Sequence, residues 1–341
     1  MSGEAATRPL RLGVLGTAHI ARAFIAGVAP SQSVAVTAVA SRDAHRARAF
    51  AAANGVAGAC GSYEELLADP RIDAIYNPLP NSLHAAWSVR ALEAGKHVLC
   101  EKPLATSATE VRAMFDAARA HGLHLVEAFP YWSQPHAIRL RELVAAGAFG
   151  ELRTIQAAFG FLLGEPGNIR YDPALGGGAL LDAGTYPVSL VRMIAGQRPA
   201  RVCASARWHA GGVDETLIAS LEHQGGLLAQ ISCSFASGLH REALIAGTKG
   251  VLRTTYLNTP PPDRPAVMQW RRGASWDEPY QTIEVPALNG FRAEAESFER
   301  LVRLGPAHWN GATPTESLDI MCTLEAILRS AREHRPVEVG D

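Results

Sequence analysis

The chain has 341 residues, a length that favours two domains over one. Hydrophobic residues make up 48% and charged residues 19%, a mixture that is typical of a folded globular protein and excludes a disordered one. Lys and Arg number 32 against 33 Asp and Glu, and this net charge of −1 argues against a nucleic-acid-binding protein, which usually has a basic excess.

The five cysteines are scattered along the chain and form no CxxC pair. We interpret them as reduced thiols of a cytoplasmic protein, and we expect neither a disulfide framework nor a bound metal. The N-terminus has no apolar signal segment, and Pro30 interrupts the charge-free run of residues 23–41. We therefore expect neither export nor a membrane-spanning segment.

The first part of the chain alternates short apolar runs with helical segments. We predict strands at residues 11–16, 34–40, 74–77, 97–100 and 124–128, and helices at residues 19–29, 43–53, 63–68, 84–94 and 106–121. This alternation predicts βαβ units, and right-handed crossovers then give a doubly wound parallel sheet. Ligands of such sheets bind beyond the carboxyl ends of the strands.

After about residue 130 the pattern changes. Longer strands are expected at residues 152–163, 200–209, 216–222, 227–235 and 242–246, without helices between most of them, and helical periodicity returns at residues 291–304 and 315–333. We therefore predict an α/β protein in which a doubly wound Rossmann domain (residues 8–129) precedes an α/β domain with an open antiparallel sheet (residues 130–341). The C-terminal helices could pack on either domain.

The first strand is followed by Gly16-Thr17-Ala18-His19-Ile20-Ala21, which keeps the first glycine of G-x-G-x-x-G and has alanine at the other two places. Small residues here let pyrophosphate oxygens approach the amides of a helix N-terminus. A tight strand–helix turn without a ligand gives the same pattern. The second strand ends at Ser41-Arg42, and a hydroxyl followed by a guanidinium suits the 2′-phosphate of NADP. Asp43 follows directly and leaves NAD possible, and Arg42 could also be a solvated surface residue.

Two further segments carry candidate catalytic groups. The fourth predicted strand leads into Glu101-Lys102-Pro103, where a lysine at the carboxyl end of a strand points to the expected position of a cofactor's reactive ring. Asp182 and Tyr186 are four residues apart and share one helix face if a helix starts near Gly178. A phenol near a cofactor can exchange a proton with a carbonyl or an alcohol, although a tyrosine that only packs the helix fits the same spacing.

Taken together, these segments resemble the glucose–fructose oxidoreductase, inositol dehydrogenase and rhizopine catabolism (Gfo/Idh/MocA) family. The resemblance covers nearly the whole chain, and its most specific part is the Gly-Lys-His-Val-x-x-Glu-Lys-Pro segment of residues 95–103. It rests in addition on Gly16-x-Ala18, Ala40-Ser41-Arg42, the loop from Pro78 to His84, and Gly176 to Tyr186.

The resemblance implies the site residues. Lys102 would lie at the active centre and bind the reacting oxygen, while Glu101 would orient the ribose and the lysine, and the Lys102–Pro103 bond could be cis, as in relatives. The cofactor-binding residues are then expected to be Gly16, Thr17, Ala18, His19, Ile20, Ser41, Arg42, Pro80, Asn81, His84, Glu101 and Lys102. The open sheet often forms a dimer face in this family, which implies a homodimer or a higher oligomer.

Tyr186 decides the branch of the family that the chain resembles, because inositol-dehydrogenase-like members have histidine there. Tyrosine is similar to the branch of glucose–fructose oxidoreductase, dihydrodiol dehydrogenase and xylose dehydrogenase, as is the segment from Asn168 to Tyr171. Arg170, Tyr131 and Trp132 are then the expected substrate-binding residues. Trp132 stands where many relatives have an arginine, which puts that arginine's sugar contacts in question.

The expected function is an oxidoreductase that uses NADP, or alternatively NAD, to transfer hydride to or from a secondary alcohol or carbonyl of a sugar, keto-sugar or cyclic diol. Tyr186 would exchange the proton with its pKa brought down by Lys102, Lys102 would polarise the oxygen, and Asp182 would bind substrate. Two alternatives are a cofactor-binding sensor and an NAD-dependent glycoside hydrolase on the same fold. Retention of Glu101, Lys102, Asp182 and Tyr186 argues against the sensor.

Overall fold

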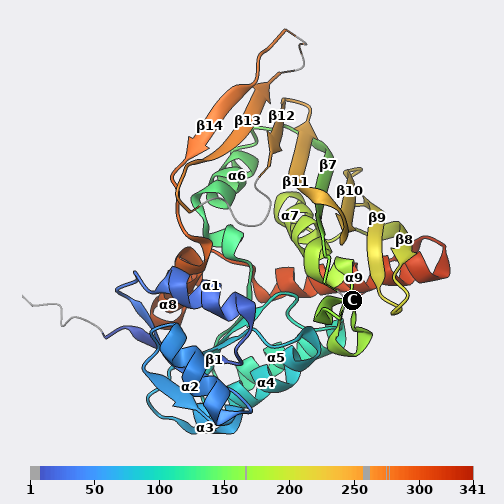
Figure 1. Cartoon of the computed structure of the whole chain (residues 1–341). Helices are drawn as coiled ribbons and strands as arrows, with labels where there is room; N and C mark the ends of the chain where they lie inside the picture. The colour runs from blue at the N-terminus through green and yellow to red at the C-terminus, as the bar shows by residue number, and fades with distance from the viewer. Residues whose placement is uncertain (1–7, 166, 256–261, 274, 276, 341) are drawn as a thin grey trace, which may run out of the picture.

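A computed structural model describes residues 8–165, 167–255, 262–273, 275 and 277–340 of the chain. Figure 1 shows two β-sheets, one below and one above, with the long helix α9 (Pro314–Glu333) lying between them. This helix packs against α5 (Ala108–Ala120) of the lower part and against β8 (Arg201–Trp208) of the upper part. The predicted α/β class is confirmed.

The lower sheet consists of six parallel strands in the order β3-β2-β1-β4-β5-β6. All five strands predicted in this region are present, with bounds that differ from the prediction by at most one residue at either end. The unpredicted strand is β3, a three-residue edge strand that is too short to show a periodic pattern. The strands are β1 (Leu10–Leu15), β2 (Val34–Ala40), β3 (Gly58–Cys60), β4 (Ala74–Asn77), β5 (His97–Glu101) and β6 (Leu125–Ala128).

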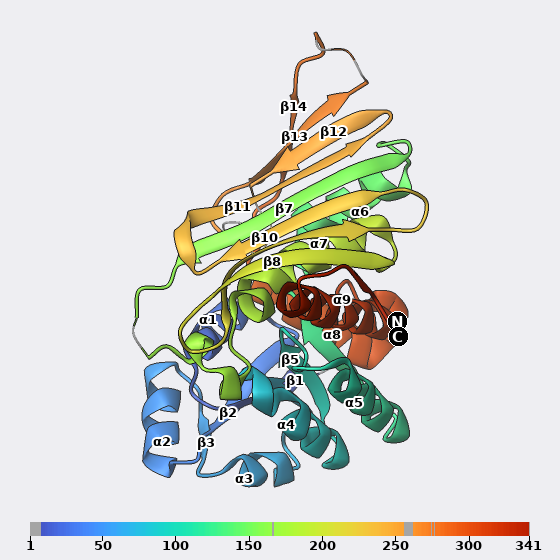
Figure 2. The same cartoon turned by 90° about the vertical axis from the view of Figure 1, so that its right-hand side faces the viewer.

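Helices on both faces complete a Rossmann fold (Figure 2). Asp43, Ser62 and Ser107 cap α2, α3 and α5 by accepting hydrogen bonds from backbone N–H groups of the first turns. The fourth helix begins at residue 81, three residues before its predicted start. The remaining bounds are α1 (His19–Val28), α2 (Ala44–Ala53), α3 (Tyr63–Ala68) and α4 (Asn81–Glu93).

The upper sheet has nine strands in the order β14-β13-β12-β11-β7-β10-β9-β8-β15. It is antiparallel except between β7 and β10, so the predicted antiparallel sheet is confirmed with one parallel pair. Strands β12 to β15 were not predicted. The bounds are β7 (Leu152–Leu162), β9 (Asp214–Glu222), β10 (Leu228–Ser234), β11 (Ala236–Gly247), β12 (Gly250–Thr254), β13 (Ala266–Arg272), β14 (Gln281–Val285) and β15 (Val337–Glu338).

The helices of the second half cover one face of this sheet and also reach the Rossmann part. Helices α6 (Pro135–Ala145) and α7 (Thr185–Ala195), neither of which was predicted with these bounds, lie behind the sheet in Figure 2. Helix α8 (Gly290–Leu304) packs against α1, where Phe291 meets Phe24 edge-to-face. The division at residue 129 stays a prediction. None of the described helices is long and apolar enough to cross a membrane.

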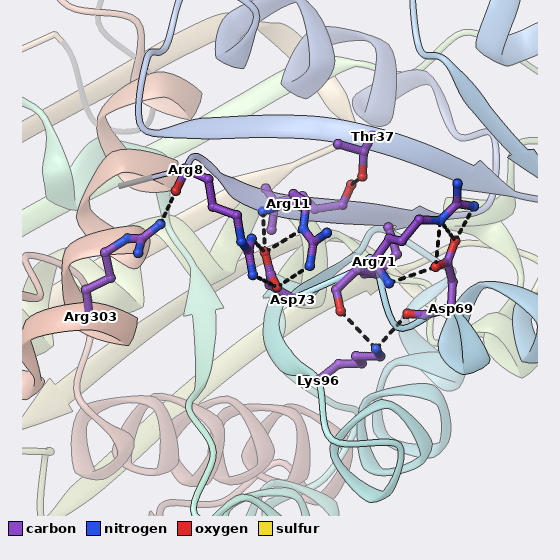
Figure 3. Close-up of polar contacts among 10 residues, drawn as sticks. Arg8, Arg11, Thr37, Asp69, Arg71, Asp73, Lys96 and Arg303 are labelled. Atoms are coloured by element: carbon purple, nitrogen blue, oxygen red, sulfur yellow. Dashed lines mark hydrogen bonds and ion pairs between the residues drawn. The ribbon is translucent and has the colours of Figure 1, made fainter. Parts of the chain in front are cut away.

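A polar network ties the strand ends opposite the site to the C-terminal half (Figure 3). Asp73 pairs with Arg8 at 2.6 Å and with Arg11 at 2.9 Å. The ammonium group of Lys96 donates to two backbone carbonyls, each at 2.8 Å, and Arg303 of α8 donates to the Arg8 carbonyl. The Arg303 contact joins α8 to the residue that lies two positions before β1, while the Asp73 and Lys96 contacts join segments of the Rossmann part to one another.

Candidate active site

A cleft of about 1180 Å³ lies between the carboxyl ends of the Rossmann strands and the end of β7. All twelve predicted cofactor-binding residues line it, and so do Arg170, Asp182 and Tyr186. Residues far apart in the sequence therefore meet in one place, as the parallel topology requires. No group of three or more His, Cys, Asp or Glu side chains suited to a metal occurs within the described ranges.

The turn after β1 exposes backbone donors to the cleft. Gly16 has a φ of 82°, a conformation that favours glycine, and its N–H donates to the carbonyl of Ala40 at 2.8 Å. Helix α1 then begins at His19 with no side-chain cap and no acidic residue in its first turn. The N–H groups of that turn lack side-chain acceptors, so this helix end can receive an anion.

The residues after β2 make one side of the cleft cationic. Arg42 and Arg46 both line it, together with Ser41 and Asp43. The Asp43 carboxylate already accepts from the backbone N–H of His45 at 2.8 Å and of Arg46 at 3.0 Å, and these bonds lower its pKa. Asp43 therefore caps the helix through one oxygen, Oδ1, and the two arginines are cationic groups on this side of the cleft that suit a second phosphate.

Lys102 lies at the base of the cleft, and its side chain is 10% exposed. It follows the last residue of β5, and the bond to Pro103 is cis, in agreement with what the resemblance implied. Its ammonium group donates to the Asp182 carboxylate at 2.7 Å and to the Asp182 carbonyl at 3.0 Å. It also lies 4.8 Å from the centre of the Tyr186 ring. An ammonium carries three N–H donors, so these two bonds leave one for a ligand.

Buried groups clamp the turn that carries Lys102 on both sides. The ring nitrogens of His84 lie 2.8 Å from the Pro103 carbonyl and 2.7 Å from the Leu79 carbonyl. Glu127, at the end of β6, accepts from the N–H of Leu104 at 3.0 Å, and burial raises its pKa to about 7. His84 was expected beside the cofactor; it lines the cleft, and its ring is held by the main chain.

Asp182 is held between two cations. Arg170 donates to its second carboxylate oxygen at 2.6 Å, opposite the Lys102 contact. Burial alone would raise the pKa of Asp182, but Lys102 and Arg170 outweigh that effect and hold it at about 2. Asp182 was expected to bind substrate, and this stays a prediction; in this structure one carboxylate oxygen accepts from Lys102 and the other from Arg170.

A short π-helical turn (Leu180–Gly184) precedes α7 and brings Asp182 and Tyr186 to the same side of the cleft. The buried carboxylate of Asp214 holds the start of this turn by accepting from the N–H of Leu180 at 2.6 Å. Gly178 has a φ of 118°, and a side chain there would collide with Asp214. The glycines before the turn therefore serve close backbone contacts.

The environment of Tyr186 overturns one expectation. Burial raises its pKa well above 10, and the nearby carboxylates of Glu101 and Asp182 add to this effect, whereas a lowered pKa was predicted from Lys102. A raised pKa keeps the phenol protonated over the physiological range, and this is the form in which it can donate a proton. Its ring packs against Phe129 and Phe159.

Tyr131 and Trp132 are not brought to the cleft. Each is 1% exposed, and neither is among the described residues that line it. The Tyr131 hydroxyl is bonded to Ser189 at 2.7 Å, and its ring lies 6.1 Å from that of Tyr186. The two aromatic residues expected to bind substrate instead form the packing layer behind Tyr186.

The comparisons with known proteins agree with this geometry. Residues 10–129 match the description "Oxidoreductase family, NAD-binding Rossmann fold" and residues 137–253 match "GFO/IDH/MocA C-terminal domain". The chain belongs to the Gfo/Idh/MocA family. The resemblance noted in the sequence is thereby confirmed, and so is the description of the chain as a member of a family of NAD(P)-binding oxidoreductases.

Three known proteins are similar to this chain in sequence, and one of them has been compared with it in structure. D-xylose 1-dehydrogenase (NADP(+)) 2 of Haloferax volcanii is 37% identical over 97% of this chain and 100% of its own length. Trans-1,2-dihydrobenzene-1,2-diol dehydrogenase of Mus musculus is 39% identical over 74% of this chain and 76% of its own. A 3-ketoreductase from Actinomadura kijaniata, solved with NADP and TDP-benzene, is 32% identical and superimposes with a TM-score of 0.86 over 95% and 98% of the two chains.

Sequence reasoning missed three polar residues of this Gfo/Idh/MocA protein that the structure places at or near the site. Arg46 lies one turn after Arg42, and this helical spacing could have indicated it. Glu127 stands beside Lys102 because β6 neighbours β5, a pairing that no local pattern reveals. Glu294 belongs to α8, which returns to the Rossmann part from the far end of the chain.

Proposed function

We propose that the chain is an NADP-dependent oxidoreductase that transfers hydride between nicotinamide and a secondary alcohol or carbonyl of a sugar, keto-sugar or cyclic diol. One observation carries the proposal: Lys102, Asp182 and Tyr186 line the same cleft as the uncapped N-terminus of α1 and Arg42. The dehydrogenases of xylose and dihydrobenzenediol and the 3-ketoreductase support the substrate class.

The residues at the Rossmann end fit a dinucleotide phosphate. A side chain at Gly16 would crowd Leu79 at 3.0 Å and close the approach to the α1 N–H groups that would hold the pyrophosphate. Arg42 and Arg46 would hold the 2′-phosphate, because both line this side of the cleft and a guanidinium group can bind phosphate oxygens through two N–H groups. When bound, the cofactor supplies the hydride acceptor or donor.

Lys102 of the Rossmann part and the residues of the second half that surround it fit carbonyl and alcohol chemistry. Lys102, oriented by Asp182, donates its remaining N–H to the substrate oxygen and stabilises the negative charge that develops there. Tyr186 is neutral and donates a proton to that oxygen in the direction of reduction. Arg170 lies beside the same carboxylate and lines the cleft, so it is placed to contact the substrate's hydroxyl groups.

The absorbance of reduced nicotinamide tests the proposal. The protein is incubated with NADP and a panel that contains D-xylose, further aldoses and a trans-dihydrobenzenediol, and the formation of NADPH is followed. We expect turnover of at least one secondary alcohol, and NADP should be used better than NAD. Bound cofactor that never exchanges, with no net oxidation of any substrate, would contradict the proposal and favour a closed redox cycle, as in the hydrolase alternative.

We also propose that the chain self-associates through the open face of the nine-stranded sheet, where a hollow of about 590 Å³ crosses β7, β10 and β11. Ile218, at the edge of this hollow, is 48% exposed. A second copy seated on this face would remove the exposed Ile218 side chain from water. Light scattering should report a dimer or larger oligomer that Ile218→Glu dissociates, and a monomeric unmodified protein would contradict this proposal.

A further inference from the structure

One buried acid behind the cleft has no role in the mechanism above. Glu294 of α8 is 1% exposed, and neither of its carboxyl oxygens has a hydrogen-bond partner in the described part of the chain. An ionised carboxylate in such surroundings is strongly disfavoured, since no donor replaces its lost hydration. These surroundings therefore favour the protonated form of Glu294.

A continuous wall of side chains connects Glu294 to the cleft. Phe291, three residues earlier and on the same helix face, lines the cleft and meets Phe24 edge-to-face at 6.0 Å. The rings of Phe24 and Tyr76 are stacked, with 3.8 Å between their centres. The Tyr76 hydroxyl donates a hydrogen bond to the Glu101 carboxylate at 2.6 Å. Glu101 itself lines the cleft directly before Lys102.

Two buried carboxyl groups thus lie within electrostatic reach of each other. Burial raises the pKa of Glu294 well above its usual range, and the negative charge of Glu101 raises it further. Burial also raises the pKa of Glu101 against the opposing effects of Tyr76 and Lys102. The other titratable groups that act on the pair are Asp182 and Tyr186, at and just after the turn before α7, and Cys100 and Glu127 of β5 and β6. Burial raises the pKa of Glu127 to about 7.

We propose that Glu101 and Glu294 form an acid pair that retains a proton beside the neutral, reduced nicotinamide and releases it when the oxidised, cationic ring is bound. The inference rests on the cofactor site proposed above. A cation in the cleft favours the ionised form of carboxyl groups nearby, whereas a neutral ring has no such effect. The pair would therefore keep the net charge of the buried site nearly constant through the reaction.

The proton balance of the reaction accords with this role. Reduction of a carbonyl forms one C–H bond with hydride from the cofactor and one O–H bond with the proton of Tyr186. The phenolate that remains must regain a proton, while the cofactor has gained one positive charge. Loss of one proton from the acid pair supplies the proton that the phenolate needs. It also leaves a negative charge that compensates the positive charge of the oxidised cofactor. Glu294 acts through Glu101, so it is a positioning and charge-compensating residue and contacts no substrate.

Isothermal titration calorimetry measures the protons directly. NADP and NADPH are each titrated into the protein in buffers of different ionisation enthalpy, which gives the number of protons released per cofactor bound. NADP and NADPH carry the same 2′-phosphate. The difference between their numbers of released protons therefore reports the effect of the charge on the nicotinamide ring. We expect NADP to release roughly half to one proton more than NADPH near neutral pH, and the ratio of their Kd values to change by up to about tenfold per pH unit.

The Glu294→Gln variant keeps the shape of the side chain and removes its proton. We expect it to abolish the difference between the two cofactors, while Glu296→Gln, on the same helix and paired with Arg292, should retain it. Equal proton release by NADP and NADPH in the unmodified protein, or a difference that survives in Glu294→Gln, would overturn the inference. If the variant does not fold, the pH dependence of the unmodified protein decides. Failure of both cofactors to bind would overturn the proposed function as well.

Discussion

Lys102 and Asp182, which are 80 residues apart in the chain, form an ion pair in which the ammonium lies 2.7 Å from the carboxylate. The pair joins the end of β5 to the helical turn that carries Tyr186. Arg170 holds the other oxygen of the same carboxylate, so one acid fixes two cations at the base of the cleft. This arrangement sets the position of the groups that, in the function we propose, act on the substrate oxygen.

Removal of the two groups at the oxygen should abolish turnover without loss of cofactor binding. Tyr186→Phe removes the proton donor and Lys102→Met removes the charge, and each should lower kcat by about 100-fold or more. The Kd for NADPH should stay within about threefold, because the phosphate groups bind elsewhere. Steady-state kinetics and fluorescence titration measure the two quantities. Full activity of Tyr186→Phe would remove this residue from the proton path.

Arg42 and Arg46 should determine the preference for NADP. We expect Arg42→Ala to raise the Kd for NADPH at least about tenfold and Arg46→Ala to raise it less, with little effect on NADH in either case. Arg48→Ala is the matched control, because Arg48 is exposed on α2, the helix that carries Arg46, and does not line the cleft. Equal effects on NADPH and NADH would show that the arginines do not contact the 2′-phosphate.

Asp182→Asn should weaken the fold in a pH-dependent way. The pKa of Asp182 is about 2 in the folded chain, below its value of about 3.9 in an unfolded one. Its stabilising contribution is therefore present above about pH 4 and is lost as the pH falls toward 2. Denaturant unfolding should show Asp182→Asn to be less stable by about 1–3 kcal/mol at neutral pH, with a smaller difference near pH 3. A difference independent of pH would contradict the ion-pair account.

Gly178→Ala should disturb the turn that carries Asp182. The substitution places a methyl group against Asp214 at a φ of 118°, which only glycine adopts readily. We expect a loss of roughly 1–3 kcal/mol in the free energy of unfolding and a fall in kcat. Gly238→Ala is the control, since no atom lies within 4 Å of a side chain there. Equal behaviour of the two variants would argue against the close contact.

The sequence predicted the parts of the site that depend on local patterns. The Rossmann strands, the Lys102 turn and Tyr186 all follow from short motifs in a fixed order. Glu127 and Glu294 could not be found in this way, because their roles depend on strand pairing and on the return of α8. The raised pKa of Tyr186 was also missed, since burial and two carboxylates from other segments outweigh the single cation that the sequence suggested.

Tyr131 and Trp132 show the limit of reasoning from family positions. Both follow the last Rossmann strand, where relatives place a substrate contact, and the sequence gives no signal that they are buried. In the structure the Trp132 ring packs against Phe129 and the Arg141 guanidinium. Trp132 therefore stabilises the packing layer behind Tyr186 and does not form part of the wall of the cleft.

Deuterium transfer tests the central claim most directly. NADPH that carries deuterium at both C4 positions of its ring is incubated with the protein and a carbonyl substrate, and the product is analysed by mass spectrometry and NMR. We predict one deuterium per product molecule, on the new carbinol carbon, and equal amounts of NADP and product. Product that lacks deuterium, or cofactor that is unchanged after many turnovers, would contradict net hydride transfer.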